Sequence, residues 1–110
     1  MVIIKQGEDY RKILKLQYAD TGDPVYATGI TSACTLRDKA GGTVYAKATC
    51  TVISNYVTIE ILFSAVKTAS IPAGNYGYDV WIKDSSGHHC IYTTDVQVVP
   101  PYTDYTDLDE

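Results

Sequence analysis

Histidine, the usual base and metal ligand of a protein site, occurs in this chain only as the adjacent pair His88-His89. Successive residues of a strand point to opposite faces of a sheet, so both rings cannot reach one metal ion without a kink. Neither histidine has a cysteine or a carboxylate at a usual ligand spacing, and no serine lies in a nucleophile-elbow context. The sequence therefore indicates no metal, no cofactor and no catalytic residues, and we expect a protein that is not an enzyme.

The acidic and glycine-rich segments favour turns over ligand sites. Asp20-Thr21-Gly22-Asp23 lacks the longer spaced series and the final glutamate of an EF-hand calcium loop. Asp and Gly form turns for backbone reasons alone, so a turn is the better interpretation. Gly41-Gly42 and Gly74-Asn75 are followed by no helix N-terminus, and we do not expect them to bind phosphate.

Tyrosine is the compositional oddity, with 10 Tyr against one Phe and one Trp. Four tyrosines share the parity of the apolar core residues: Tyr18, Tyr76, Tyr78 and Tyr92. Three aromatic residues fall on the opposite face: Tyr45, Tyr56 and Trp81. Exposed aromatic side chains can anchor a protein interface or stack on sugar rings, whereas the alternative is that they only cover neighbouring strands. The candidate interface residues are Tyr45, Tyr56, Trp81, Tyr102 and Tyr105.

Three hairpins position these residues and place their apolar side chains on one buried face. Their loops are Lys39-Ala40-Gly41, with glycine where the backbone needs a positive φ, Ser54-Asn55, and Ser85-Ser86-Gly87. The expected pairs are Leu36 with Val44 and Cys34 with Ala46, then Val52 with Val57, Cys50 with Ile59 and Ala48 with Ile61, and finally Ile82 with Cys90, Val80 with Tyr92 and Tyr76 with Val96. A shift of one residue would turn every apolar side chain to the wrong face.

The remaining strands follow from period-two alternation and from turn-forming residues every eight to twelve positions. The expected strands are 2–6, 10–18, 31–38, 42–53, 56–63, 75–83 and 88–99, with a possible short strand at 25–30. Ser64 is expected to cap one helical turn over residues 64–69. This pattern predicts an all-β, antiparallel immunoglobulin-like β-sandwich of seven to eight strands over residues 1–101. Residues 102–110 are expected to form a flexible acidic tail that docks, if at all, on a partner.

Composition narrows the class of protein further. The 110 residues fit one domain, and the net charge of −4 comes from the tail, since Asp104, Asp107, Asp109 and Glu110 leave the body neutral. With no basic cluster and no long apolar run, we expect neither a nucleic-acid partner nor a membrane span. No secretory signal is recognisable at the start of the sequence, so we expect a chain made for the cytosol or one already trimmed.

The three cysteines are expected to be reduced and to face the core. Their number is odd, so at least one thiol is unpaired in a monomer. In the expected register Cys34 and Cys50 lie ~13 Å apart, which is too far for a disulfide.

Turn motifs follow one another in a distinct order along the chain: a Gly-acidic turn after the first strand in Ile3-Ile4-Lys5-Gln6-Gly7-Glu8-Asp9, a turn at Asp20-Thr21-Gly22-Asp23-Pro24, the passage from Ser64-Ala65-Val66-Lys67-Thr68 to Ile71-Pro72-Ala73-Gly74-Asn75-Tyr76-Gly77-Tyr78-Asp79, and a closing hairpin from Asp84-Ser85-Ser86-Gly87 to Val96-Gln97-Val98. This order resembles the small β-sandwich modules of tailed-phage tail and baseplate proteins. The likeness covers about residues 1–99. The chain departs from it at Asp95, where those modules often have glycine, and in its acidic tail.

The resemblance implies a non-enzymatic virion structural or adaptor protein of a tail, baseplate or fibre attachment. Its implied partners are other virion structural proteins, in a homo-oligomer or a hetero-assembly, and its implied location is the virion after synthesis in the host cytoplasm. The alternative is a carbohydrate- or ligand-binding β-sandwich module that uses the exposed Tyr and Trp side chains.

Overall fold

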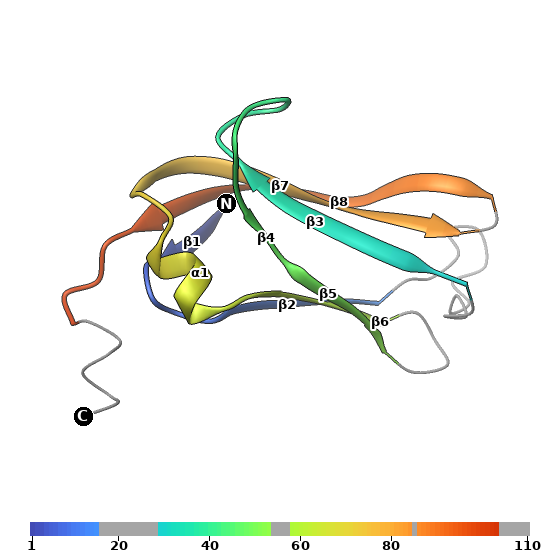
Figure 1. Ribbon diagram of the computed structural model, residues 1–110, viewed down its shortest axis with the longest axis horizontal. Coiled ribbons are helices and arrows are strands. Elements are labelled where there is room, and N and C mark those ends of the chain that lie inside the picture. The colour runs from blue at the N-terminus through green and yellow to red at the C-terminus, as the bar shows by residue number, and fades with distance from the viewer. Residues whose placement is uncertain (16–28, 54–57, 85, 104–110) are drawn as a thin grey trace.

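The computed structural model describes residues 1–15, 29–53, 58–84 and 86–103, which form two β-sheets packed face to face (Figure 1). The described strands are β1 (Val2–Lys5), β2 (Tyr10–Lys15), β3 (Thr31–Arg37), β4 (Val44–Lys47), β5 (Thr49–Ile53), β6 (Thr58–Phe63), β7 (Gly74–Asp84) and β8 (Gly87–Val99). One short helix, α1 (Ala65–Ala69), lies between β6 and β7. The predicted all-β sandwich is confirmed.

The strand order is β1-β8-β7-β3-β4 in the larger sheet and β2-β6-β5 in the smaller one. Only Ala48 separates β4 from β5, so one stretch of chain passes from the edge of one sheet to the edge of the other (Figure 1). Each described strand pair is antiparallel except β1 with β8, which run parallel with Val2 opposite Val96. The sandwich is therefore mixed at one edge, whereas the sequence pattern predicted antiparallel pairing throughout.

The core lies between the sheets and is built from alternate residues of each strand. In β7 the side chains of Tyr76, Tyr78 and Val80 are buried, and in β6 those of Ile59 and Ile61 are buried against them. β-Branched and aromatic residues suit this pleated, half-buried surface. The buried hydrophobic residues are Ile4, Cys34, Leu36, Ala46, Ile59, Ile61, Phe63, Ile71, Tyr76, Tyr78, Val80, Ile82, Val96 and Val98.

The first hairpin has a different register from the expected one. Leu36 pairs with Ala46 instead of Val44, because the loop before β4 is longer and the register then shifts: Arg37 pairs with Val44, which leaves Tyr45 as an extra residue in β4. The Asp38 carboxylate stabilises this loop by accepting a hydrogen bond from the Thr43 backbone N–H at 3.0 Å. Gly41 has the expected positive φ, at 72°. The longer loop is therefore held by a contact between a side chain and the backbone.

This shift also changes the distance between two cysteines. The Ala48 backbone N–H donates to the Cys34 carbonyl at 3.0 Å, which places Ala48 beside Cys34. Cys50 lies two residues beyond Ala48, about 7 Å along the strand. The expected separation of ~13 Å is therefore wrong, although both thiols are free as expected.

The second hairpin is also shifted by two residues. Val52 pairs with Ile59 and Cys50 with Ile61, in place of the expected partners Val57 and Ile59. Ala48, expected opposite Ile61, lies outside the β5–β6 pairing. A shift of two preserves the face on which each side chain lies, so the inward parity is confirmed. The expected loop and Tyr56 lie outside the described residues.

In the third hairpin the register changes part of the way along. Tyr76 pairs with Val96 and Val80 with Tyr92, as expected. The register shifts between Val80 and Trp81, so Ile82 pairs with His89 and the expected partner Cys90 lies opposite Trp81. The bulge inserts one extra residue into β8, and Cys90 is exposed instead of facing the core.

The segment between β6 and β7 connects the two sheets at one end of the sandwich (Figure 1). As expected, Ser64 caps α1, and its hydroxyl accepts a hydrogen bond from the Lys67 backbone N–H. Thr68 is fully buried, with its hydroxyl 3.1 Å from the Gly7 backbone N–H that donates to it. The same hydroxyl donates to the Glu8 carbonyl at 2.7 Å. Thr68 therefore connects α1 by hydrogen bonds to the turn between β1 and β2.

None of the described helices is long and apolar enough to cross a membrane.

Replacing Thr68 with valine should destabilise the sandwich by about 1–3 kcal/mol, because it leaves the buried Gly7 N–H without an acceptor. The free energy of unfolding in urea measures this change. Thr68→Ser keeps the hydroxyl and should recover most of the loss, and Thr51→Val, at an exposed position of β5, serves as the control. Equal effects of Thr68→Val and Thr51→Val would contradict the role of this hydrogen bond.

Candidate functional site

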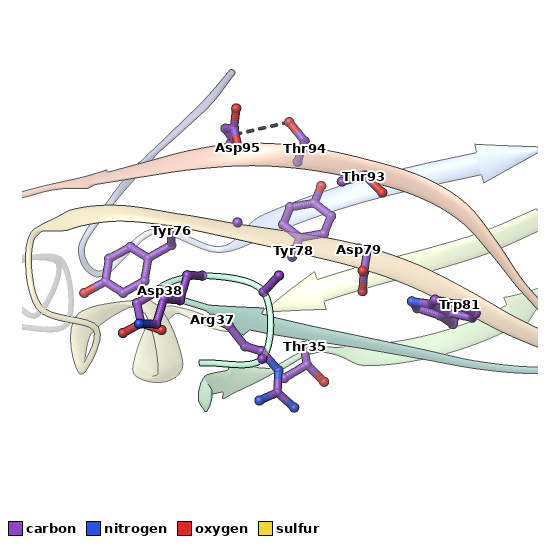
Figure 2. Close-up of a pocket in the computed structure, with 14 residues that line it drawn as sticks. Thr35, Arg37, Asp38, Tyr76, Tyr78, Asp79, Trp81, Thr93, Thr94 and Asp95 are labelled. Atoms are coloured by element: carbon purple, nitrogen blue, oxygen red, sulfur yellow. Dashed lines mark hydrogen bonds between the residues drawn. The ribbon is translucent and has the colours of Figure 1, made fainter. Parts of the chain in front are cut away.

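A groove of about 550 Å³ lies on the outer face of the larger sheet, over β3, β7 and β8 (Figure 2). In β7 its residues Gly77, Asp79 and Trp81 alternate with side chains that are buried in the core. Residues 38–41, in the loop between β3 and β4, line one end. The groove is therefore built on the central strands of a sheet whose other face is the core.

A glycine lies between two charged residues at one end of the groove. Gly77 pairs with Arg37 on β3 and with Asp95 on β8. A Cβ atom added to Gly77 would lie 3.3 Å from the Thr94 carbonyl oxygen, a tight contact. The missing side chain leaves bare backbone between a guanidinium and a carboxylate. A glycine inside a strand often marks a place where a ligand approaches the backbone closely.

The next positions along β7 add a carboxylate and an aromatic ring. Asp79 pairs with Thr35 on one side and Thr93 on the other. Trp81 pairs with the small residue Ala33 and keeps 44% of its surface exposed. Since two residues of a strand span about 7 Å, the groove extends roughly 13 Å from the glycine to the indole ring.

The charged groups of the groove are not paired with one another. The ion pairs within the described residues join Arg11 to Glu60 and His89 to Asp84. Arg37 is oriented by a hydrogen bond of 2.6 Å from its Nη1 atom to the Gly42 carbonyl. The full set of charged lining residues is Arg37, Lys39, Asp38, Asp79 and Asp95. Two cations and three carboxylates thus surround the groove, next to an aromatic face.

Of the candidate interface residues predicted from the sequence, the three that the structure describes do not share one site. Trp81 lies in the groove, whereas Tyr45 is outside its lining and packs edge-on against Tyr76 with ring centroids 5.0 Å apart. Tyr45 keeps 39% of its surface exposed, so it both covers a neighbour and faces solvent. Tyr102 is fully exposed beyond β8. Tyr56 and Tyr105 lie outside the described residues.

Sequence reasoning missed the polar residues that surround Trp81. Gly77 and Asp79 share its outward parity on β7, and that signal was readable from the alternation with Tyr76 and Tyr78. The presence of Arg37 in the groove could not be predicted from the sequence, because it depends on which strand pairs with β7.

The hairpin between β7 and β8 holds a second polar cluster that the sequence did not suggest. The Ser86 hydroxyl donates to the Asp84 carboxylate at 2.7 Å and lies 2.9 Å from His89 Nε2. The two hydrogen bonds from Ser86, one from its side chain and one from its backbone, lower the pKa of Asp84. In a catalytic triad the histidine contacts the serine and the acid through different nitrogens, but here Nε2 faces both. The cluster therefore lacks the geometry of a catalytic triad, and its hydrogen bonds stabilise the turn between β7 and β8.

No group of three or more potential metal ligands occurs within the part of the chain that the structure describes.

Three titratable side chains with raised pKa values pack in or against the core, although one of them, Tyr78, also lines the groove. The Tyr78 hydroxyl forms a hydrogen bond of 2.7 Å with the Tyr10 hydroxyl across the sandwich. Burial raises the pKa of both phenols and that of the Cys34 thiol. These groups are neutral at physiological pH and serve packing, because the charged form would be poorly solvated there.

Comparison with known proteins establishes the fold and no family. No protein-family model and no curated protein matches the sequence. Among solved structures, a "putative glycoside hydrolase" from Bacteroides vulgatus ATCC 8482 is similar over 92% of this chain, with a TM-score of 0.50 and 16% identity. The chain spans 17% of the length of that protein. CopC from Methylosinus trichosporium OB3b is similar over 96% of this chain and 91% of its own, with a TM-score of 0.45 and 16% identity.

The bulge predicts different reactivities for two thiols. Cys90, exposed after the register shift, should react with iodoacetamide at least ~10-fold faster than Cys34, which is buried and has a raised thiol pKa. Peptide mass spectrometry over a time course measures both rates in the native protein. Unfolding in urea should make the two rates similar, and similar rates in the native protein would contradict the bulged register.

Proposed function

We propose that this chain is a non-enzymatic structural or adaptor protein of a phage particle, acting through protein–protein contacts in a tail, a baseplate or a fibre attachment. The observation that carries the proposal is the position of its exposed apolar side chains. Five of them lie on the four edge strands of the two sheets: Ile3, Ile13, Val44, Tyr45 and Ile53.

One side of the sandwich carries the two most exposed of these residues. Ile3 on β1 is 58% exposed and Ile13 on β2 is 52% exposed. β1 is an edge of the larger sheet and β2 an edge of the smaller one, and a short turn connects them. Within the described residues each of these two strands pairs on one side only, and an edge strand presents a row of backbone N–H and C=O groups on its open side.

Apolar side chains on open edges favour association. Monomeric proteins usually protect edge strands with charged residues or proline, because an apolar edge pairs readily with other chains. Here Ile3 shares its face of β1 with Lys5, and Ile13 shares its face of β2 with Arg11 and Lys15, so each edge offers a partner an apolar contact beside charged side chains. Addition of a strand to a sheet edge is a common mode of recognition, in which backbone hydrogen bonds provide affinity and side chains provide specificity.

The phage setting is supported by the resemblance of the turn motifs to tail and baseplate modules. In such a particle the partners are a second copy of this chain or another virion structural protein.

Replacing both Ile3 and Ile13 with lysine should weaken self-association at least ~10-fold, because charge on both edges opposes strand pairing. Light scattering after size exclusion, over a concentration series of the full chain, measures the mass. Val66→Lys is the matched control, since Val66 is 71% exposed but lies on α1 and not on an edge. Thermal unfolding should be similar for all variants.

Two results would contradict assembly through these edges. One is a wild-type chain that stays monomeric at every concentration. The other is an equal loss of association in the Val66→Lys control.

A further inference from the structure

We propose that the groove on the outer face of the larger sheet binds a short, uncharged oligosaccharide. This site lies on the central strands β3, β7 and β8, whereas the proposed assembly contacts lie on edge strands, so the two proposals are independent.

The dimensions of the groove suit a small polar ligand. Its volume of about 550 Å³ lies within the usual range of ligand sites. The groove follows β7 from Gly77 to Trp81, an extended path of roughly 13 Å along the strand. An extended chain of linked sugar rings fits this shape better than a compact ligand does.

Trp81 supplies the apolar part of the site. Trp81 is 44% exposed and its partner on β3 is the small residue Ala33, so part of its side chain is free to contact a ligand. The face of a pyranose ring that carries axial C–H groups is apolar and packs against a flat aromatic ring. An aromatic side chain provides this contact with few rotatable bonds, so little entropy is lost on binding.

The polar groups beside Trp81 match the hydroxyl groups of a sugar. The Asp79 and Asp95 carboxylates accept hydrogen bonds, the Arg37 guanidinium donates them, and the hydroxyls of Thr35 and Thr93 do both. Each sugar hydroxyl both donates and accepts, so it can use a carboxylate and a guanidinium at once. Hydrogen bonds to charged groups of this kind are stronger than those between neutral groups.

The arrangement of charge selects an uncharged ligand. The lining holds two cations and three carboxylates: Arg37, Asp38 and Lys39 lie at the end of β3 and in the loop after it, whereas Asp79 and Asp95 lie on β7 and β8, so charges of both signs border the groove. A strongly anionic ligand would meet Asp79 and Asp95, and a strongly cationic one would meet Arg37, so either gains attraction at one end and repulsion at the other. A neutral polyol can satisfy both kinds of group without this repulsion.

Gly77 provides the space between Arg37 and Asp95. These two residues lie on opposite sides of the glycine, and any larger side chain would stand between them. The site therefore predicts that Gly77→Val blocks the groove without removing any hydrogen-bonding group. This makes it a test of shape that is separate from the loss of the aromatic ring.

The experiment is a titration of the full, isotope-labelled chain with maltotriose, cellotriose and triacetylchitotriose, followed by amide and indole NMR shifts. At least one of these sugars at millimolar concentration should shift the signals of Gly77, Asp79 and the Trp81 indole. Trp81→Ala and Gly77→Val should each weaken that binding at least ~10-fold. Tyr102→Ala, an exposed tyrosine outside the groove, and Thr51→Val, on the other sheet, should leave it unchanged.

Each outcome decides the proposal. Binding that is lost in the two groove variants and kept in the two controls supports it, and Ile3→Lys with Ile13→Lys should also keep it. The proposal is overturned if none of the three sugars shifts the NMR signals. It is also overturned if the shifts persist unchanged in Trp81→Ala and Gly77→Val. Tighter binding of a charged sugar, titrated in the same way as trigalacturonate, overturns the assignment to an uncharged ligand. Loss of self-association in Trp81→Ala without any sugar binding would make the groove a protein contact instead.

Discussion

The strict alternation of side chains along β7 is the constraint on which both faces of the larger sheet depend. Tyr76, Tyr78 and Val80 point into the core, so the residues between them must point outward. A slip of one residue would bury Asp79 and expose Tyr78. Because β7 pairs with β3 on one side and with β8 on the other, its register is held along both edges. The core therefore positions the groove, although none of the outward residues contributes to the packing.

The bulge after Val80 is one of two places where the register of the larger sheet shifts within the described residues, the other being between Leu36 and Arg37. Up to that point β8 keeps the register that its apolar residues favour, with Val96 opposite Tyr76. Beyond it, the extra residue in β8 turns Cys90 toward solvent and brings His89 beside the turn held by Asp84. The hairpin thus has two parts, one that belongs to the core and one that is organised by its own polar contacts.

Much of the fold follows from local chemistry that a sequence displays. The inward parity of Val52 and Cys50, the Ser64 cap and the end of β8 before Pro100 were all predictable from alternation, helix capping and proline. Loop length was not, because it depends on a side-chain contact such as that of Asp38 with Thr43. Contacts between strands far apart in sequence were likewise invisible, including the Tyr10–Tyr78 hydroxyl pair and the position of Arg37 across from Asp95. For the same reason the aromatic residue of the groove could be found from the sequence and its polar surroundings could not.

The parallel pairing of β1 with β8 has a mechanical consequence. The chain enters β1 at Val2 and leaves β8 at Val99, which lie at opposite ends of the paired segment. Tension applied between the two ends of the described sandwich would slide these strands along each other instead of peeling them apart. Sliding loads all the bonds of the ladder together, including the one from the Gln6 N–H to the Val99 carbonyl at 2.9 Å, whereas peeling breaks them one at a time. The sandwich is thus connected in the geometry that best resists a pulling force along the chain.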